Sequence, residues 1–103
     1  MKEYLSRSVF LNTDEDKELR VDYYIIESGS MMFGVLLRKF EKDNNSYKFV
    51  EANSILNITY SREEIVRICK ILSFETVFPI TLLDTLTDID IYHGRKMCSN
   101  KDF

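Results

Sequence analysis

The stretch from Ser61 to Asp90 constrains the fold most, because it carries the clearest helix signals in the chain. Ser61-Arg62-Glu63-Glu64 has the form of a capping box, in which the Ser61 hydroxyl accepts from the Glu64 N–H and the Glu64 carboxylate reaches back to the Ser61 N–H. Apolar residues then follow at the spacing of one helical face: Ile65, Ile68, Cys69 and Leu72. The pattern predicts a helix that begins directly after Ser61.

The chain's only proline, Pro79, separates this helix from a second one. Proline cannot continue a helix, but its fixed φ suits the first helical position. The residues after it form an apolar stripe with a polar opposite side, the stripe being Leu82, Leu83, Leu86 and Ile89. Two short helices hinged near Pro79 are therefore predicted.

The residues before Ser61 predict a sheet. Residues 19–23 alternate apolar and charged side chains with period two, which is typical of a half-buried strand. Further strands are predicted at residues 4–11, 31–41 and 47–52, the first at a sheet edge because Ser6-Arg7-Ser8 interrupts it. Gly34, inside the third strand, indicates a bulge or a close backbone approach. The apolar residues of 53–60 fit either a short extra strand or a place under the first helix.

Turn signals at residues 28–30 and 43–46 connect these strands as hairpins, with Gly29 supplying backbone freedom in the first and asparagines in the second. The predicted fold is α+β: an antiparallel meander of about four strands followed by two helices packed on one sheet face. A chain of 103 residues has room for one core, so residues 1–91 are expected to form a single domain. Residues 92–103 are expected to be a mobile polar tail.

Composition narrows the function and the compartment. The 14 basic and 17 acidic residues leave a net charge of −3, which argues against nonspecific binding to nucleic acid or anionic membrane. The two cysteines, Cys69 and Cys98, give neither a disulfide framework nor metal-ligand spacing. The N-terminus lacks the apolar region of a secretory signal, and the apolar runs are too short to cross a bilayer. We expect a cytoplasmic protein.

Candidate catalytic and metal-binding groups are few. Asp84 and Asp88 share a helix face and could hold a cation, but the Glu-x-x-His pair of such sites is absent, so surface acids facing solvent or a basic partner fit better. Residues 14–18 lack the glycine and the later glutamate of a calcium loop. His93, the only histidine, stands in the tail with Cys98. We expect no enzyme activity, no cofactor and no metal.

The predicted sheet carries more apolar surface than two helices can cover. Exposed apolar patches usually mark binding surfaces. We therefore expect a non-enzymatic interaction or regulatory module, a homodimer or one that docks a protein partner, with these candidate contact residues: Tyr24, Ile26, Leu36, Phe40, Asp84 and Asp88. The alternative is a small-ligand or single-stranded nucleic-acid binding domain that stacks bases on the strand aromatics Tyr23, Tyr24, Phe33, Phe40, Tyr47 and Phe49.

Two segments also resemble a known family. Phe33-Gly34-Val35 and the run from Phe78 to Ile89, with its proline, Leu-x-Asp and later aspartate, are similar to a family of short clostridial proteins of unknown function, over roughly residues 19–91. The chain departs from that pattern at Thr81, where the family has histidine, so a role of that histidine could not apply here. The resemblance implies a cytoplasmic protein of spore-forming anaerobes with no assigned activity.

Overall fold

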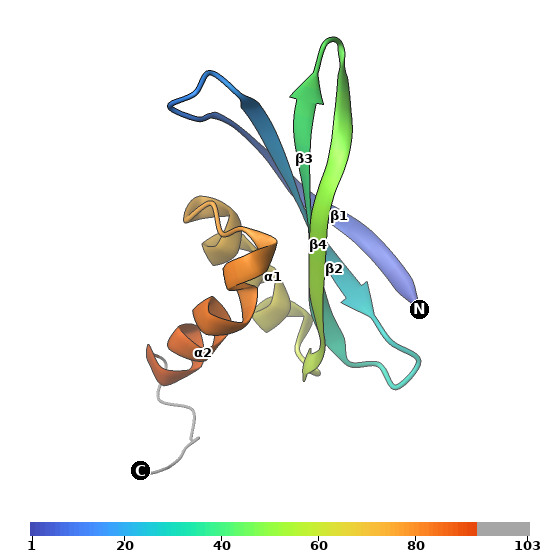
Figure 1. The fold of residues 1–103 in the computed structure, drawn as a ribbon. Coiled ribbons are helices and arrows are strands. Elements are labelled where there is room, and N and C mark those ends of the chain that lie inside the picture. The colour runs from blue at the N-terminus through green and yellow to red at the C-terminus, as the bar shows by residue number, and fades with distance from the viewer. Residues whose placement is uncertain (93–103) are drawn as a thin grey trace.

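Four antiparallel strands form one sheet, and two helices follow them in the chain (Figure 1). In a computed structural model that describes residues 1–92, the strands lie side by side in chain order: β1 (Lys2–Asn12), β2 (Glu18–Glu27), β3 (Phe33–Asp43) and β4 (Ser46–Thr59). Helix α1 (Arg62–Phe74), the 3-10 turn η1 (Pro79–Thr81) and helix α2 (Leu82–Tyr92) complete the fold. The predicted antiparallel meander and the two following helices are confirmed.

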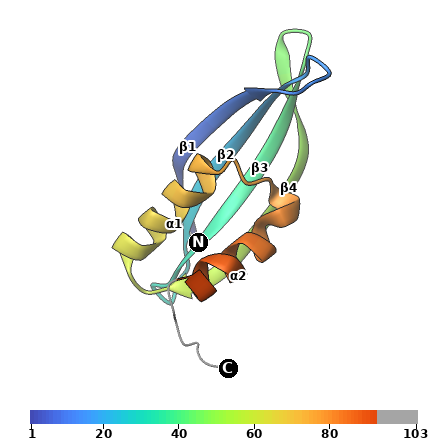
Figure 2. The same ribbon diagram turned by 90° about the vertical axis from the view of Figure 1, so that its left-hand side faces the viewer.

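The helices cover one face of the sheet (Figure 2). Period-two alternation along β2 and β3 sends one set of side chains toward the helices, and Val21, Tyr23 and Leu37 are fully buried there. They pack in one core with the apolar stripes of both helices, including Ile68, Leu72 and Leu82. Full burial of such a side chain contributes about 1.5–3 kcal/mol. This core fixes which face of the sheet remains free.

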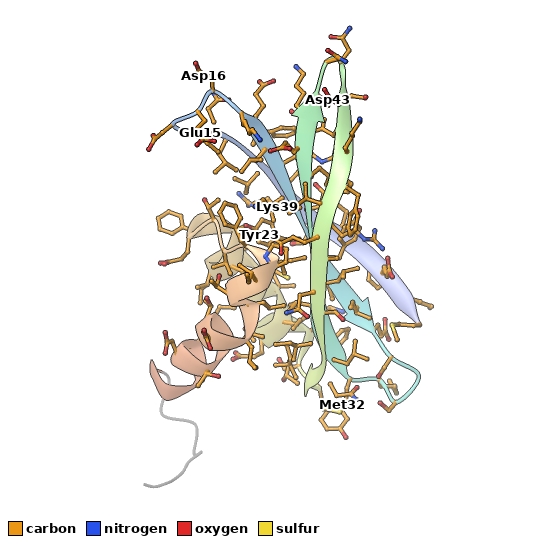
Figure 3. All side chains as sticks on the ribbon, viewed as in Figure 1. Glu15, Asp16, Tyr23, Met32, Lys39 and Asp43 are labelled. Atoms are coloured by element: carbon orange, nitrogen blue, oxygen red, sulfur yellow. The ribbon has the colours of Figure 1, made fainter. Side chains whose placement is uncertain are left out.

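Polar contacts attach the α1–α2 connection to the sheet. Tyr23, which lies between sheet and helices (Figure 3), donates its hydroxyl to the Val77 carbonyl at 2.9 Å. The side-chain amide of Asn53 donates to the Pro79 carbonyl at 3.2 Å. The sequence predicts Pro79 at the first position of the second helix; it begins the 3-10 turn η1, and α2 follows directly from Leu82. The connection is therefore held to two different strands.

The start of α1 agrees with the predicted cap in one of its two hydrogen bonds. The Ser61 hydroxyl accepts from the Glu64 N–H at 3.1 Å. The expected return bond is replaced, because the Ser61 N–H donates to the Thr59 hydroxyl at 3.0 Å, and the Glu64 carboxylate pairs with Arg67. A side chain from the end of β4 thus caps the helix together with Ser61.

The strand boundaries differ from the sequence prediction mainly in β4. Residues 53–60, which the sequence left between two placements, continue β4 to Thr59. β1 is an edge strand, as predicted, and its register with β2 shifts between Leu5 and Arg7. Gly34 meets β4 closely: a Cβ there would lie 2.8 Å from Leu56 Cα and nearer still to the Ile55 carbonyl oxygen. The close backbone approach predicted at Gly34 is confirmed, and the register between β3 and β4 also shifts there, between Phe33 and Val35.

Both hairpin turns form, with one difference. Asn44 takes a positive φ of 60°, as asparagine in a turn can, but in the turn before β3 the positive φ belongs to Met31, at 67°, and not to Gly29. The predicted tail shortens by one residue, because α2 includes Tyr92. The rest of that tail, with His93 and Cys98, lies outside the described residues. Across residues 1–92, no helix has both the length and the apolar character needed to span a membrane.

Candidate interaction surface

The helix-free side of the sheet, here called the outer face, is the candidate functional surface (Figure 1). Its side chains form rows across the strands because the registers align them. One row, the aromatic row, consists of Phe10, Arg20, Phe40 and Phe49. The next row toward the other end of the strands consists of Ser8, Asp22, Arg38 and Ala52, and is called the small-residue row after Ser8 and Ala52 at its two ends. The two rows differ sharply in size at both sheet edges.

The centre of the aromatic row is a stacked arginine. The Arg20 guanidinium lies 4.2 Å from the Phe40 ring centroid and 5.0 Å from that of Tyr47. Phe49 and Phe10 extend this cluster through edge contacts, Phe49 to Phe40 at 6.0 Å and Phe10 to Tyr47 at 6.1 Å. Such pairs contribute about 0.5–1.5 kcal/mol beyond burial. The cluster thus has a defined geometry.

Asp22 anchors this arginine from the neighbouring row. Its carboxylate is buried to 5% exposure, accepts from the Ser8 hydroxyl at 2.8 Å, and lies 3.1 Å from Arg20 Nε. The Arg20 Nε–H makes no directed hydrogen bond, so the contact is an ion pair by proximity. Because the Arg20 guanidinium is half-covered and lies beside the buried Asp22 carboxylate, its planar group stays flat on the sheet.

The charges of the outer face neutralise one another. Besides the pair of Arg20 and Asp22, the Arg38 guanidinium lies 3.4 Å from Glu3, and the Lys42 ammonium lies 2.9 Å from Glu18. Glu18 raises the pKa of Lys42 through this hydrogen bond. Within the described part of β2 and β3, every cation of this face therefore has an acidic partner on the same face.

The candidate residues named from the sequence separate into two groups. Tyr24, Leu36 and Phe40 lie together on the outer face and are partly exposed. Ile26 lies there too, but at 3% exposure it offers almost no surface to a partner. Asp84 and Asp88 are exposed on α2, in the helix layer on the other side of the sheet. The acids and the strand residues therefore cannot form one site within a single copy.

Two of the most exposed residues of this face were not among those candidates. Phe10 is 63% exposed on the edge strand β1, and Phe49 is 60% exposed on the opposite edge strand β4. From the sequence, Phe49 is predicted only as part of a base-stacking platform. Recognising Phe10 and Phe49 as neighbours of one row requires the strand registers, which hydrophobic periodicity does not give.

The fold places some residues of that predicted base-stacking platform in the core and the others on the outer face. Tyr23 and Phe33 point into the core and are 0% and 6% exposed, so neither can stack on a ligand. Tyr24, Phe40, Tyr47 and Phe49 remain on the outer face. Burial also raises the pKa of Tyr23 far above its usual value.

A shallow groove in the helix layer is lined by Ile71, Val77, Phe78 and Ile89, with Glu75 and Asp88 among its polar residues. Asp84 does not line it. Across the described residues, no three side chains of the types that bind metals come together. The groove therefore contains no cluster of potential metal ligands around Asp88.

Comparison with known proteins places the chain among relatives of unknown activity. No curated protein and no solved structure matches this chain. A sequence model of one family covers the sheet and nearly all of both helices, including the outer face and the Pro79 turn. The chain belongs to the family of unknown function DUF6514, whose sequence model matches residues 2–90.

Proposed function

We propose that this protein is a non-enzymatic interaction or regulatory module that forms a homodimer through the outer face. The observation that carries the proposal is the exposure of large apolar side chains on a regular sheet surface. Phe10, Phe49 and Leu5 are each more than half exposed there, at 63%, 60% and 57%. Apolar side chains gathered on one face are typical of a surface that binds another protein.

The charge pattern favours a second copy over a nucleic acid. A groove for single-stranded nucleic acid tracks the phosphates with free cations. Here Arg20, Arg38 and Lys42 already have carboxylate partners, so phosphate binding would have to break those pairs. A neutral face with alternating signs can instead meet its own copy without excess repulsion.

The outer face is also large enough. Strands about 4.8 Å apart, with a rise of about 3.3 Å per residue, give four strands of roughly ten residues a projected area of about 600 Å². The accessible area is larger, because side chains stand above that plane. Stable interfaces bury about 800 Å² per partner. One sheet face therefore suffices for a standard-sized homodimer.

Light scattering on a size-exclusion column tests the proposal. The unmodified chain should elute as a dimer at micromolar concentration, and Phe49→Glu should elute as a monomer with an unchanged circular dichroism spectrum. Phe74→Glu is the matched control, because Phe74 is 87% exposed in the helix layer, away from the outer face. A strictly monomeric unmodified chain, or equal effects of both variants, contradicts the proposal.

The same protein can be used to test the alternative. Salt-dependent binding of a single-stranded oligonucleotide, lost in Phe49→Glu but not in Phe74→Glu, would replace dimerisation with nucleic-acid binding as the function of this face. The expected result is no binding at low salt.

We also propose a cytoplasmic setting in a clostridial host. The resemblance stated above supports it. Fractionation of host cells with an antibody against the protein tests this, and recovery of the protein in the medium would contradict it.

A further inference from the structure

The two rows of the outer face are complementary to each other, and we infer that a second copy binds with its rows reversed. In this arrangement the aromatic row of each copy packs on the small-residue row of the other. The inference rests on the proposed homodimer and adds its geometry: which strand faces which, and which side chains meet.

The two rows are complementary first in the size of their side chains. At the β4 edge, Phe49 is the large member of one row and Ala52 the small member of the next. At the β1 edge, Phe10 and Ser8 repeat the same contrast. Close packing requires large side chains to fill the space above small ones, because an unfilled gap loses dispersion contacts. Each copy therefore offers both the projections and the recesses.

A twofold axis that runs across the strands, between the two rows, satisfies this requirement. It places β4 of one copy over β4 of the other and exchanges the rows. Phe49 then lies over the partner's Ala52, and Phe10 over the partner's Ser8. Packed sheets keep their strand directions within about 30°, which this axis permits.

Charge agrees with the same arrangement. Arg20 would lie over the partner's Asp22, so no like charges meet there, although Asp22 is 5% exposed and already held by its own Ser8 and Arg20. Phe40 would face the partner's Arg38, which places a cation on an aromatic ring. In one copy these groups already pair in related ways, Arg20 with Asp22 and with Phe40, so their side chains have the required chemistry.

The competing twofold axis runs along the strands and is disfavoured by size. It would place β1 over β4 and keep each row over itself. Opposite charges would still meet, because Asp22 would face the partner's Arg38. Phe10 would then meet the partner's Phe49, while Ser8 met the partner's Ala52, so two large groups would hold the sheets apart above two small ones. Size, not charge, separates the two arrangements.

Exchanging the sizes tests the contact between rows. Ala52→Phe should weaken dimerisation at least tenfold, although it adds apolar surface, because it meets the partner's Phe49. Phe49→Ala should also weaken it. The double variant Phe49→Ala, Ala52→Phe should recover affinity to within a few-fold of the unmodified chain. Sedimentation equilibrium measures the dissociation constants, and thermal unfolding of each variant confirms folding.

Cross-linking tests the axis independently with small substitutions. In a Cys98→Ser background, Ser8→Cys and Ala52→Cys chains carrying different tags are mixed and treated with a short bismaleimide. Cys69 should not react, because it is 1% exposed and burial raises the pKa of its thiol to about 12. We expect links between like variants only, because β1 lies over β1 and β4 over β4.

The outcomes separate this inference from the proposed function. Efficient mixed links between Ser8→Cys and Ala52→Cys chains, or a dimer indifferent to Ala52→Phe, would overturn the row exchange and leave the homodimer standing. Monomeric behaviour of the unmodified chain would overturn both.

Discussion

Gly34 shows how a single residue determines the path of β4. A Cβ at this position would lie 2.8 Å from Leu56 Cα, so the backbone of β4 would have to move. We expect Gly34→Ala to destabilise the protein by about 1–3 kcal/mol, the usual cost of overpacking. Urea unfolding measures it. Gly29→Ala is the matched control, since no atom lies within 4 Å of its added Cβ. Equal stability of the two variants would contradict the assigned role of Gly34.

Because two buried side chains have raised pKa values, we expect the protein to lose stability at alkaline pH. Burial raises the pKa of the Cys69 thiol from 9.0 to about 12, and burial also raises that of Tyr23 above 10.0. The folded chain therefore keeps protons that the unfolded chain releases. Their contribution is complete below pH 9 and declines as the pH rises, first for Cys69 and from pH 10 also for Tyr23.

Between pH 9 and 10 this loss should come mainly from Cys69, with a slope of up to about 1.4 kcal/mol per pH unit. Urea unfolding in a Cys98→Ser background measures it. Cys69→Ala lowers stability at every pH by leaving a small cavity, but it should flatten the slope in this window. An unchanged slope would show that the pKa of Cys69 is the same in the folded and the unfolded chain.

At the scale of elements, the helix α1 depends on its cap. The Ser61 hydroxyl is the acceptor for the Glu64 N–H, which has no carbonyl partner within the helix. Ser61→Ala should cost about 1 kcal/mol, and Ser61→Asp should retain most of the stability because aspartate caps equally well. Chemical unfolding of the two variants provides the comparison. Equal stability of Ser61→Ala and the unmodified chain would contradict the assigned role of the Ser61 hydroxyl.

The elements also show where sequence reasoning succeeds and fails. Alternation in β2 and β3 predicts Val21, Tyr23 and Leu37 on one face, because a sheet packed on one side must alternate. The second half of β4 has no such signal, because its register with β3 shifts between the Phe33–Thr59 and Val35–Ile55 pairs. Asn57 in the same segment has a positive φ of 56°, which interrupts the alternation of side chains between the two faces.

At the scale of the whole molecule, the candidate surface could be predicted only in part. Periodicity separates Tyr24 and Phe40 from the core residues once the helices are assigned to a face. It cannot place Phe10 beside Arg20 or Phe40 beside Phe49, because those neighbours come from strand pairing. Nor can it show that Arg38 is paired with Glu3, 35 residues away. The contrast in size between the two rows at the sheet edges exists only in the assembled sheet.

A homodimer makes the stability of the whole molecule depend on its concentration. If only folded chains associate, raising the concentration shifts the equilibrium toward the folded dimer. For a dimer of this size, each tenfold increase should raise the midpoint of thermal unfolding by about 3 °C. Scanning calorimetry or fluorescence over three decades of concentration measures it. Phe49→Glu should unfold at a lower temperature that is the same at every concentration, whereas Phe74→Glu should keep the dependence. A midpoint of the unmodified chain that does not move would mean that the outer face is not covered by a second copy.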